Sequence, residues 1–313
     1  MHNKTYRKLR YGLAGIAIAA ALGVPATVAT AATKINIAHV LGVDFLPVFV
    51  AKDNGCFAGK DLDVTLTLVP IVSNIPATLL AGANQIGMTT APVVLQAVEN
   101  GLDLVVVAGS SRMSKDNPTM SVVMRQDVKA ATAADLKGKR IAVPGINSLG
   151  DIVFRKWLKN NGVAAGEVST VEAPIPQMPD LLKGGTVDGV VIMEPLRSRI
   201  TGAGTGYRHP QEYYPATAPD SVLTMWISTG AWAKANGPAI TAFRGCVADA
   251  ITSIKAKPDD ARKVEEKYLK VTSPTYPVHE ATIKPEDLKI HADISTELGL
   301  LKKPVDLKAI VLP

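Results

Sequence analysis

The stretch of sequence that decides the fold is AADLKGKRIAVPGINSLGD, residues 133–151. Its pattern predicts a helical turn at 135–136 that ends at Gly138, and then a buried strand over 140–143. A loop of proline, glycine, asparagine and serine follows and leads into a helix predicted over 150–160. Such a loop directs backbone N–H groups and the positive end of the helix dipole at one point. We therefore expect this point to bind a carboxylate, sulfonate, nitrate or phosphate group.

Outward from this stretch, short apolar strands alternate with helices along the chain. Strand-like runs lie at 35–38, 64–69, 85–89, 104–108, 168–171 and 189–193, and helical stretches at 46–54, 75–81, 93–100, 239–255 and 259–269. A further helix and turn is predicted within 284–299, after a proline-rich connection. Alternation of this kind predicts α/β sheets that are mostly parallel and covered by helices.

The length and the order of these elements predict two domains. About 280 residues follow the first 31, which is more than one typical domain needs. The β-prone segments 120–125 and 222–228 are expected where the chain crosses between the domains. This places the first domain at 32–120 and 226–313, and the second at 121–225. Because open α/β sheets bind ligands beyond the carboxyl ends of their strands, we expect a ligand in the cleft between the domains, with closure about the crossings.

Five phrases, taken in order, carry a family resemblance. They are INIA at 35–38, FVAKDNGCF at 49–57, LLAGANQIG at 79–87, DLKGKRIAVP at 135–144 and LKGGTVDGVVIMEP at 182–195. Together they resemble the nitrate/sulfonate/taurine class of periplasmic solute-binding proteins, the ligand-capturing components of ABC importers. The resemblance implies a periplasmic-binding-protein fold of type II, in which two doubly wound α/β domains are joined by two crossing strands and close like a Venus flytrap. It also implies two partners, an inner-membrane ABC permease and its ATPase.

The first 31 residues have the pattern of a secretory signal peptide. Four basic residues precede an apolar run at 13–24, and Ala29-Thr30-Ala31 is an A-x-A cleavage signal. The apolar run is too short and too rich in glycine and alanine to favour a membrane span. Arg7-Lys8 is not a twin-arginine pair, and no cysteine follows the cleavage signal. We therefore expect export by the general secretory route to the periplasm, as a freely diffusing monomer.

Removal of this leader changes the net charge. The whole chain has 34 basic and 28 acidic residues, and four of the basic ones lie in the leader. Thirty basic residues then remain against 28 acidic ones, a net charge of +2. A nearly neutral chain has no electrostatic footprint for nucleic acid, and we expect no nucleic-acid partner.

Cys56 and Cys246 are the only cysteines in the sequence. In an oxidising periplasm they can pair, but a wide separation in sequence carries no geometric information. We favour two partly buried free thiols, with a disulfide as the alternative.

The strongest ligand-binding candidates stand where a strand gives way to a helix. In the second domain they are Asn147, Ser148, Leu149 and Gly150, and in the first domain Thr89 and Thr90. These loops supply N–H groups and hydroxyls to the same cleft. The alternative is that their side chains merely cap the helices that they precede.

Other candidates follow the remaining strands. They are Asp44, Phe45, Ser73, Asn74, Ser110, Arg112, Glu194 and Trp226. Phe45 and Trp226 either line the cleft or belong to the core. Arg112 either pairs with an anionic ligand or lies at the surface. Glu194 suits a ligand with an amine or amide, and its alternative is an interdomain or hinge salt bridge.

The sequence lacks the residue patterns of the common catalytic and metal sites. The histidines, at positions 2, 39, 209, 279 and 291, do not have metal-ligand spacing. A G-x-S-x-G elbow, a glycosidase carboxylate pair and a P-loop are also missing. We therefore expect no metal, no cofactor and no catalytic activity.

The leading hypothesis is the substrate-binding component of an ABC transporter that captures a small sulfonate, nitrate or taurine-like anion. One alternative is a binding protein for a pyrimidine or thiamine precursor or an aromatic acid. Another is an enzyme on the same fold, such as the pyrimidine-precursor synthases of thiamine biosynthesis, whose cysteine-rich motif is missing here. The effector domain of a LysR-like regulator is disfavoured because no helix-turn-helix precedes Lys34. An exported sensor subunit that presents ligand to a membrane kinase stays open.

Overall fold

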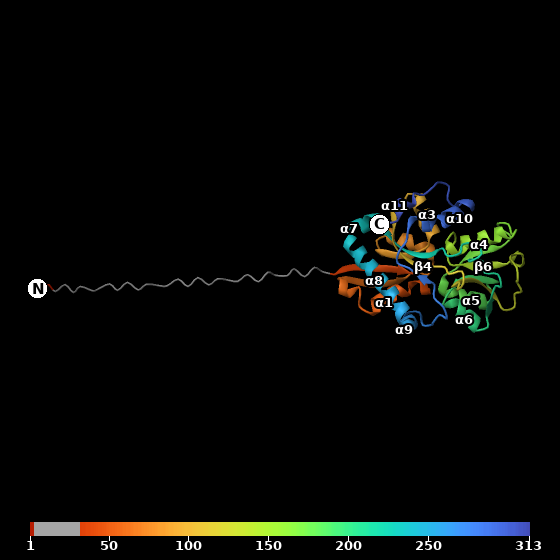
Figure 1. Cartoon of the computed structure of the whole chain (residues 1–313), viewed down its shortest axis with the longest axis horizontal. Coiled ribbons are helices and arrows are strands. Elements are labelled where there is room, and N and C mark those ends of the chain that lie inside the picture. The colour runs from red at the N-terminus through yellow and green to blue at the C-terminus, as the bar shows by residue number, and fades with distance from the viewer. Residues whose placement is uncertain (3–31) are drawn as a thin grey trace. The chain divides into compact units, whose positions relative to one another are not determined.

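The computed structural model describes residues 1–2 and 32–313, so the predicted leader lies, apart from Met1 and His2, outside the described residues (Figure 1). Residues Ala32–Pro313 form one compact unit that contains two β-sheets. We call the first sheet with the helices packed on it the first lobe, and the second sheet with its helices the second lobe.

The first lobe is built on a six-stranded sheet. Its strands lie in the order β11 (Val278–His279), β4 (Leu104–Arg112), β10 (Val222–Thr229), β3 (Ile86–Thr89), β1 (Thr33–His39) and β2 (Leu62–Leu68). Its principal helices are α1 (Leu46–Asp53), α2 (Ile75–Leu80), α3 (Ala91–Glu99), α7 (Gly230–Ala235), α8 (Gly237–Ala256), α9 (Pro258–Leu269), α10 (Lys289–Glu297) and α11 (Leu307–Ile310). Short 3₁₀ turns, η1 (Val43–Phe45), η2 (Ala58–Lys60), η3 (Val72–Asn74) and η6 (Pro285–Leu288), join them.

The second lobe is built on a five-stranded sheet. Its strands lie in the order β7 (Ser169–Glu172), β6 (Arg140–Val143), β8 (Gly189–Met193), β5 (Met120–Arg125) and β9 (Gly206–Arg208). Its helices are α4 (Leu149–Asn160), α5 (Met178–Lys183) and α6 (Leu196–Gly202), with the turns η4 (Ala133–Leu136) and η5 (Ile175–Gln177). Figure 1 shows α4, α5 and α6 grouped around β6. Across the described residues, no helix reaches the length and apolarity that a membrane span requires.

Both sheets are mixed, which differs from the expectation of mostly parallel strands. β2, β1 and β3 are parallel, as are β7, β6 and β8. β10 runs antiparallel to β3 and β4, and β5 runs antiparallel to β8 and β9. β10 and β5 each follow a link from the other lobe, through residues 209–221 and 113–119. Because no crossover helix precedes them within their own sheet, nothing turns them parallel to their neighbours.

Packing inside the second lobe fixes the position of α4. All five residues of β8 and three of the four in β6 are buried, as expected of strands covered on both faces. α4 buries Ile152, Val153 and Phe154 together with Trp157 and Leu158, and leaves Asn160 exposed. The apolar face of α4 therefore fixes the direction in which its first turn points.

A disulfide joins Cys56, which follows α1, to Cys246 in α8. Their Cα atoms are 5.7 Å apart although 190 residues separate them in sequence. The interpretation of two free thiols is therefore wrong. The packing of α8 on α1 brings the two cysteines together, and no local sequence pattern encodes that contact.

Candidate functional site

The two lobes meet through the loops that follow their parallel strands. The Val43 N–H donates to the carbonyl of Glu194 (3.3 Å), and the Val72 N–H donates to the carbonyl of Pro144 (3.3 Å). The Ile175 N–H donates to the carbonyl of Pro70 (3.0 Å). Loops after β1 and β2 thus face loops after β6, β7 and β8. This is the edge at which open α/β sheets bind their ligands.

The starts of α3 and α4 converge at this edge. Thr90 is the N-cap of α3 and Ser148 the N-cap of α4, and both side chains are buried. The Leu149 N–H donates to Thr90 Oγ1 at 3.4 Å, which links the lobes. Ser148 Oγ has no hydrogen-bond partner among residues 32–313, and neither cap side chain bonds to its own helix there. The capping alternative therefore does not account for these two hydroxyls.

Close packing shapes the loop before α4. Asn147 has a φ of +60°, in the left-handed region that asparagine tolerates better than most residues. A Cβ on Gly145 would lie 3.1 Å from Ser73 Oγ, so glycine lets this loop approach the first lobe. A Cβ on Gly150 would lie 3.1 Å from the Val191 side chain and 3.2 Å from the Pro144 ring. Gly150 thus packs closely against Val191 and Pro144 inside the second lobe, with little room for a side chain.

Asp151 and Arg155 hold the same loop from the first two turns of α4. Asp151 Oδ2 accepts the Asn147 N–H at 2.8 Å and pairs with Arg155 Nη2 at 3.1 Å. Arg155 Nη2 also donates to Asn147 Oδ1 at 2.8 Å. Gln96 of α3 donates to the Asn147 carbonyl at 3.0 Å. Burial raises the pKa of Asp151, against the lowering effect of the Arg155 guanidinium.

Asp44 supplies a second buried carboxylate, in η1 of the first lobe. Ser111 Oγ donates to Asp44 Oδ1 (2.5 Å) and lies 2.8 Å from Thr224 Oγ1. Ser110 Oγ donates to the Asp44 carbonyl at 2.8 Å. Burial raises the pKa of Asp44, and the Ser111 hydrogen bond opposes that rise. Asp44 and Ser110 therefore belong to one polar cluster at the end of β4.

Ser73 and Thr89 also lie where the lobes meet. Ser73 Oγ donates to the Glu172 carboxylate of the second lobe at 3.2 Å, and its neighbour Asn74 is exposed. Thr89 Oγ1 is 3.4 Å from the Val72 carbonyl. Ser73 thus contacts the second lobe directly, while Thr89 bonds within its own lobe.

The remaining predicted residues have partners of other kinds. Phe45 and Trp226 are fully buried, with ring centroids 5.0 Å apart, and both pack in the core. Arg112 pairs with Glu280 and with Asp287 (2.6 Å) at the far edge of the first sheet. Phe45 and Trp226 thus contribute to core packing, and Arg112 contributes to ion pairs.

Glu194 is committed within its own lobe. The Arg197 guanidinium lies 2.6 Å from Glu194 Oε1, and Ser198 Oγ donates to the same oxygen at 2.9 Å. The hydrogen bond of Glu194 to the first lobe uses its backbone carbonyl, which accepts the Val43 N–H.

Sequence reasoning missed two tyrosines on the returning link. Tyr213 and Tyr214 are fully buried, and Tyr213 OH has no hydrogen-bond partner within the described chain. Burial raises the pKa of both phenols; the negative charge of Asp151 adds to the effect on Tyr213, and that of Asp44 to the effect on Tyr214. The link 209–221 therefore passes near both buried carboxylates. An aromatic pair shortly before the crossing expected at 222–228 was the available signal.

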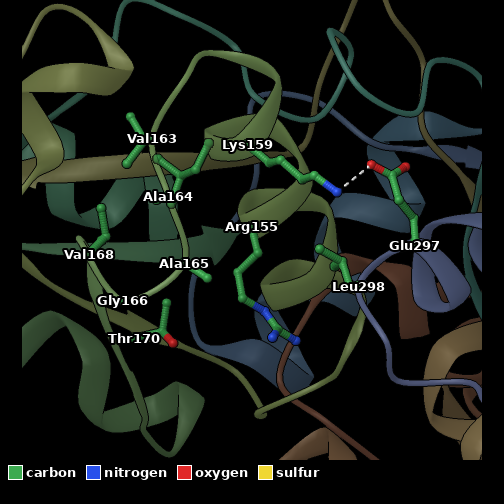
Figure 2. Close-up of a pocket in the computed structure, with 11 residues that line it drawn as sticks. Arg155, Lys159, Val163, Ala164, Ala165, Gly166, Val168, Thr170, Glu297 and Leu298 are labelled. Atoms are coloured by element: carbon green, nitrogen blue, oxygen red, sulfur yellow. Dashed lines mark ion pairs between the residues drawn. The ribbon is translucent and has the colours of Figure 1, made fainter.

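A separate pocket of about 620 Å³ opens beside α4, away from the facing loops. In Figure 2, Arg155 and Lys159 of α4 lie between the loop with Ala164 and Ala165 on one side and Glu297 and Leu298 of the first lobe on the other. Lys159 Nζ pairs with Glu297 at 3.0 Å across the lobes. Within the described residues, no group of three or more His, Cys, Asp or Glu side chains forms a metal site.

Comparisons with known proteins complete the description of the site. A family model described as NMT1/THI5 like matches residues 43–261. No curated protein sequence matches the chain.

Several solved structures share the fold. The alkanesulfonate-binding protein SsuA from Xanthomonas axonopodis pv. citri bound to MOPS has a TM-score of 0.77 at 18% identity, covering 91% of this chain and 99% of its own. The periplasmic nitrate-binding protein NrtA from Synechocystis PCC 6803 has a TM-score of 0.76 at 16% identity, covering 89% and 84%. The periplasmic aliphatic sulphonate binding protein SsuA from Escherichia coli has a TM-score of 0.70 at 16% identity, covering 89% and 97%. These likenesses confirm the predicted fold class, a periplasmic-binding-protein fold of two α/β lobes.

Proposed function

The chain belongs to the NMT1/THI5-like family, and from this premise we propose that it is the solute-binding component of an ABC importer. In this proposal it captures a small sulfonate, nitrate or taurine-like anion between its lobes and delivers it to an inner-membrane permease with its ATPase. It acts as an exported, monomeric, periplasmic protein.

The observation that carries the proposal is the convergence of the α3 and α4 starts. A buried hydroxyl without a partner costs free energy unless a ligand or water satisfies it, and Ser148 Oγ is such a group within the described chain. Thr90 and Ser148 stand at helix starts in different lobes, where N–H groups and helix dipoles favour an anion. An anion held there contacts both lobes at once and stabilises their closed arrangement.

Two arginines of the second lobe already have carboxylate partners. The Arg155 and Arg197 guanidinium groups are already paired with Asp151 and Glu194. The helix starts offer neutral hydrogen-bond donors instead of an unpaired cation. Such donors suit weakly basic anions such as sulfonate and nitrate. The solved relatives from Xanthomonas axonopodis pv. citri and Synechocystis are described as alkanesulfonate- and nitrate-binding proteins, which agrees with this class of ligand.

Asp44 supports a second candidate. A buried carboxylate attracts a ligand that carries an ammonium or amino group. Asp44 is 4% exposed, and Ser111 donates the side-chain hydrogen bond to its carboxylate. A taurine-like zwitterion or an aminopyrimidine therefore competes with a simple anion as the ligand.

A titration of the purified protein with methanesulfonate, nitrate, taurine and an aminopyrimidine tests the proposal. We expect one class to raise the melting temperature and to reduce the radius of gyration, because a ligand that binds only the closed native form stabilises it. Calorimetry should then give one site per chain with the solute chemically unchanged. No binding of any of the four, or conversion of the bound solute, would contradict the proposal.

A further inference from the structure

The negative charge of Asp151 opposes the binding of an anion at the start of α4. Asp151 is the third residue of that helix and is 1% exposed. A carboxylate in the first turn interacts with the positive end of the helix dipole, which an anionic ligand would also use, and its charge repels that ligand. Glu172 of β7 adds a second negative charge that acts on Asp151, and Tyr213 lies within the field of Asp151. The start of α4 therefore needs a compensating cation to accept an anion.

Arg155 is placed to supply that compensation. One nitrogen, Nη2, contacts Asp151 Oδ2 at 3.1 Å and Asn147 Oδ1 at 2.8 Å. Asp151 Oδ2 in turn accepts the Asn147 N–H at 2.8 Å, so three residues close a ring around the left-handed turn that precedes Ser148. Nη2 carries two N–H donors, so this one nitrogen can serve both oxygens.

We propose that Arg155 is a positioning residue for the anion site, which neutralises Asp151 and fixes the Asn147 turn so that the start of α4 can accept a ligand. This inference rests on the proposed function. Arg155 acts through Asp151 and Asn147, and it also borders the pocket of Figure 2, which leaves its side chain 30% exposed. Its partners thus lie on the side of the helix start, while its other face meets solvent.

The test compares three variants by calorimetry with methanesulfonate, or with nitrate if that is the anion bound. Arg155→Met removes the cation. The double variant Asp151→Asn with Arg155→Met removes both charges and keeps an oxygen that can accept the Asn147 N–H. Arg199→Met, an exposed arginine in α6, is the matched control for loss of one positive charge.

We expect Arg155→Met to weaken binding by about tenfold or more at neutral pH, since an uncompensated buried carboxylate then repels the anion. Because loss of the guanidinium leaves the pKa of Asp151 raised further, lowering the pH should protonate Asp151 and restore affinity in this variant. The double variant lacks the unpaired charge but also lacks the Arg155–Asn147 contact, so it should recover most of the lost affinity and show no such pH dependence. Arg199→Met should bind like the wild type.

The possible failures are distinguishable. If the wild type binds none of the anions, the proposed function falls, and this inference falls with it. If the wild type binds and Arg155→Met binds equally well, the inference alone is overturned. A loss in Arg155→Met that the double variant shares and that does not change with pH would mean that Arg155 only stabilises the fold, which also overturns it.

Discussion

The backbone N–H of Leu149 in the second lobe donates to Oγ1 of Thr90 in the first lobe, at 3.4 Å. This contact sets the starts of α4 and α3 against each other at the edge where the parallel strands of both sheets end. Each helix start brings N–H groups of its own, and Ser148 adds a buried hydroxyl. A ligand bound between them, as we propose, would accept hydrogen bonds from both lobes.

Replacing Ser148 by alanine should weaken anion binding without unfolding the protein. A hydrogen bond to an ionised group contributes about 1.5–3 kcal/mol, so affinity should fall by that amount in calorimetry. Ser295→Ala is the matched control, because Ser295 is also buried and its hydroxyl also lacks a partner within the described residues, but it lies in α10. Equal affinities for the two variants would place the anion elsewhere.

The sequence predicted most of the scaffold because its signals are local. Three strands, β5, β6 and β8, have the bounds that their apolar runs predicted. The antiparallel placement of β10 and the Cys56–Cys246 disulfide were not predictable, since both depend on contacts across more than 100 residues. Within the candidate site, the Gly/Ser loop predicted the start of α4. The roles of Asp151, Arg155 and Tyr213 could not be predicted, because they depend on which residues lie next to them in the folded chain.

A Gly150→Val variant should lose stability because of packing inside the second lobe. Even a Cβ at this position would lie 3.1 Å from Val191 and 3.2 Å from Pro144. Overpacking of this kind costs about 1–3 kcal/mol of unfolding free energy. Gly202→Val is the control, since nothing lies within 4 Å of a Cβ there. In denaturant unfolding, Gly150→Val should have a lower midpoint than Gly202→Val. Equal midpoints would show that the loop shifts to accommodate the valine side chain.

The ion pairs of Glu297 should favour closure of the lobes modestly. Lys156 and Lys159 of α4 lie 2.7 and 3.0 Å from its carboxylate and lower the pKa of Glu297. Because the pKa is lowered where Glu297 meets the two lysines, the contribution is present above the ordinary glutamate pKa and is lost as the pH falls through the lowered value. Glu297 is 39% exposed, so solvent screening limits the contribution to at most about 1 kcal/mol.

Glu297→Gln should therefore speed ligand release at low ionic strength, and added salt should remove the difference from the wild type. Stopped-flow dissociation at two salt concentrations measures this. A difference that persists in high salt would assign the effect to packing of α10.

Loss of the disulfide should lower the unfolding free energy. The bridge closes a loop with a sequence separation of 190 residues, and loops of this size restrict the unfolded chain strongly. Removing such a bridge typically costs about 2–5 kcal/mol. We expect Cys56→Ala with Cys246→Ala to unfold at lower denaturant concentration than the wild type, and a reductant to shift only the wild type. An unshifted wild type whose thiols titrate as reduced would contradict this.

Asp44→Asn should distinguish the two candidate ligand classes. Asparagine keeps an oxygen that accepts the Ser111 hydroxyl but removes the buried negative charge. If the ligand carries an ammonium group, taurine affinity should fall in the variant, and in the wild type it should fall as the pH drops through the raised pKa of Asp44. If the ligand is a simple anion, methanesulfonate affinity should rise in the variant and rise in the wild type as the pH drops, because repulsion is relieved in both cases. Calorimetry at two pH values on wild type and variant therefore gives opposite signs for the two ligand classes. An affinity that changes in neither comparison would place Asp44 outside the binding site. Its role would then be to hold Ser110 and Ser111 in place through their hydrogen bonds.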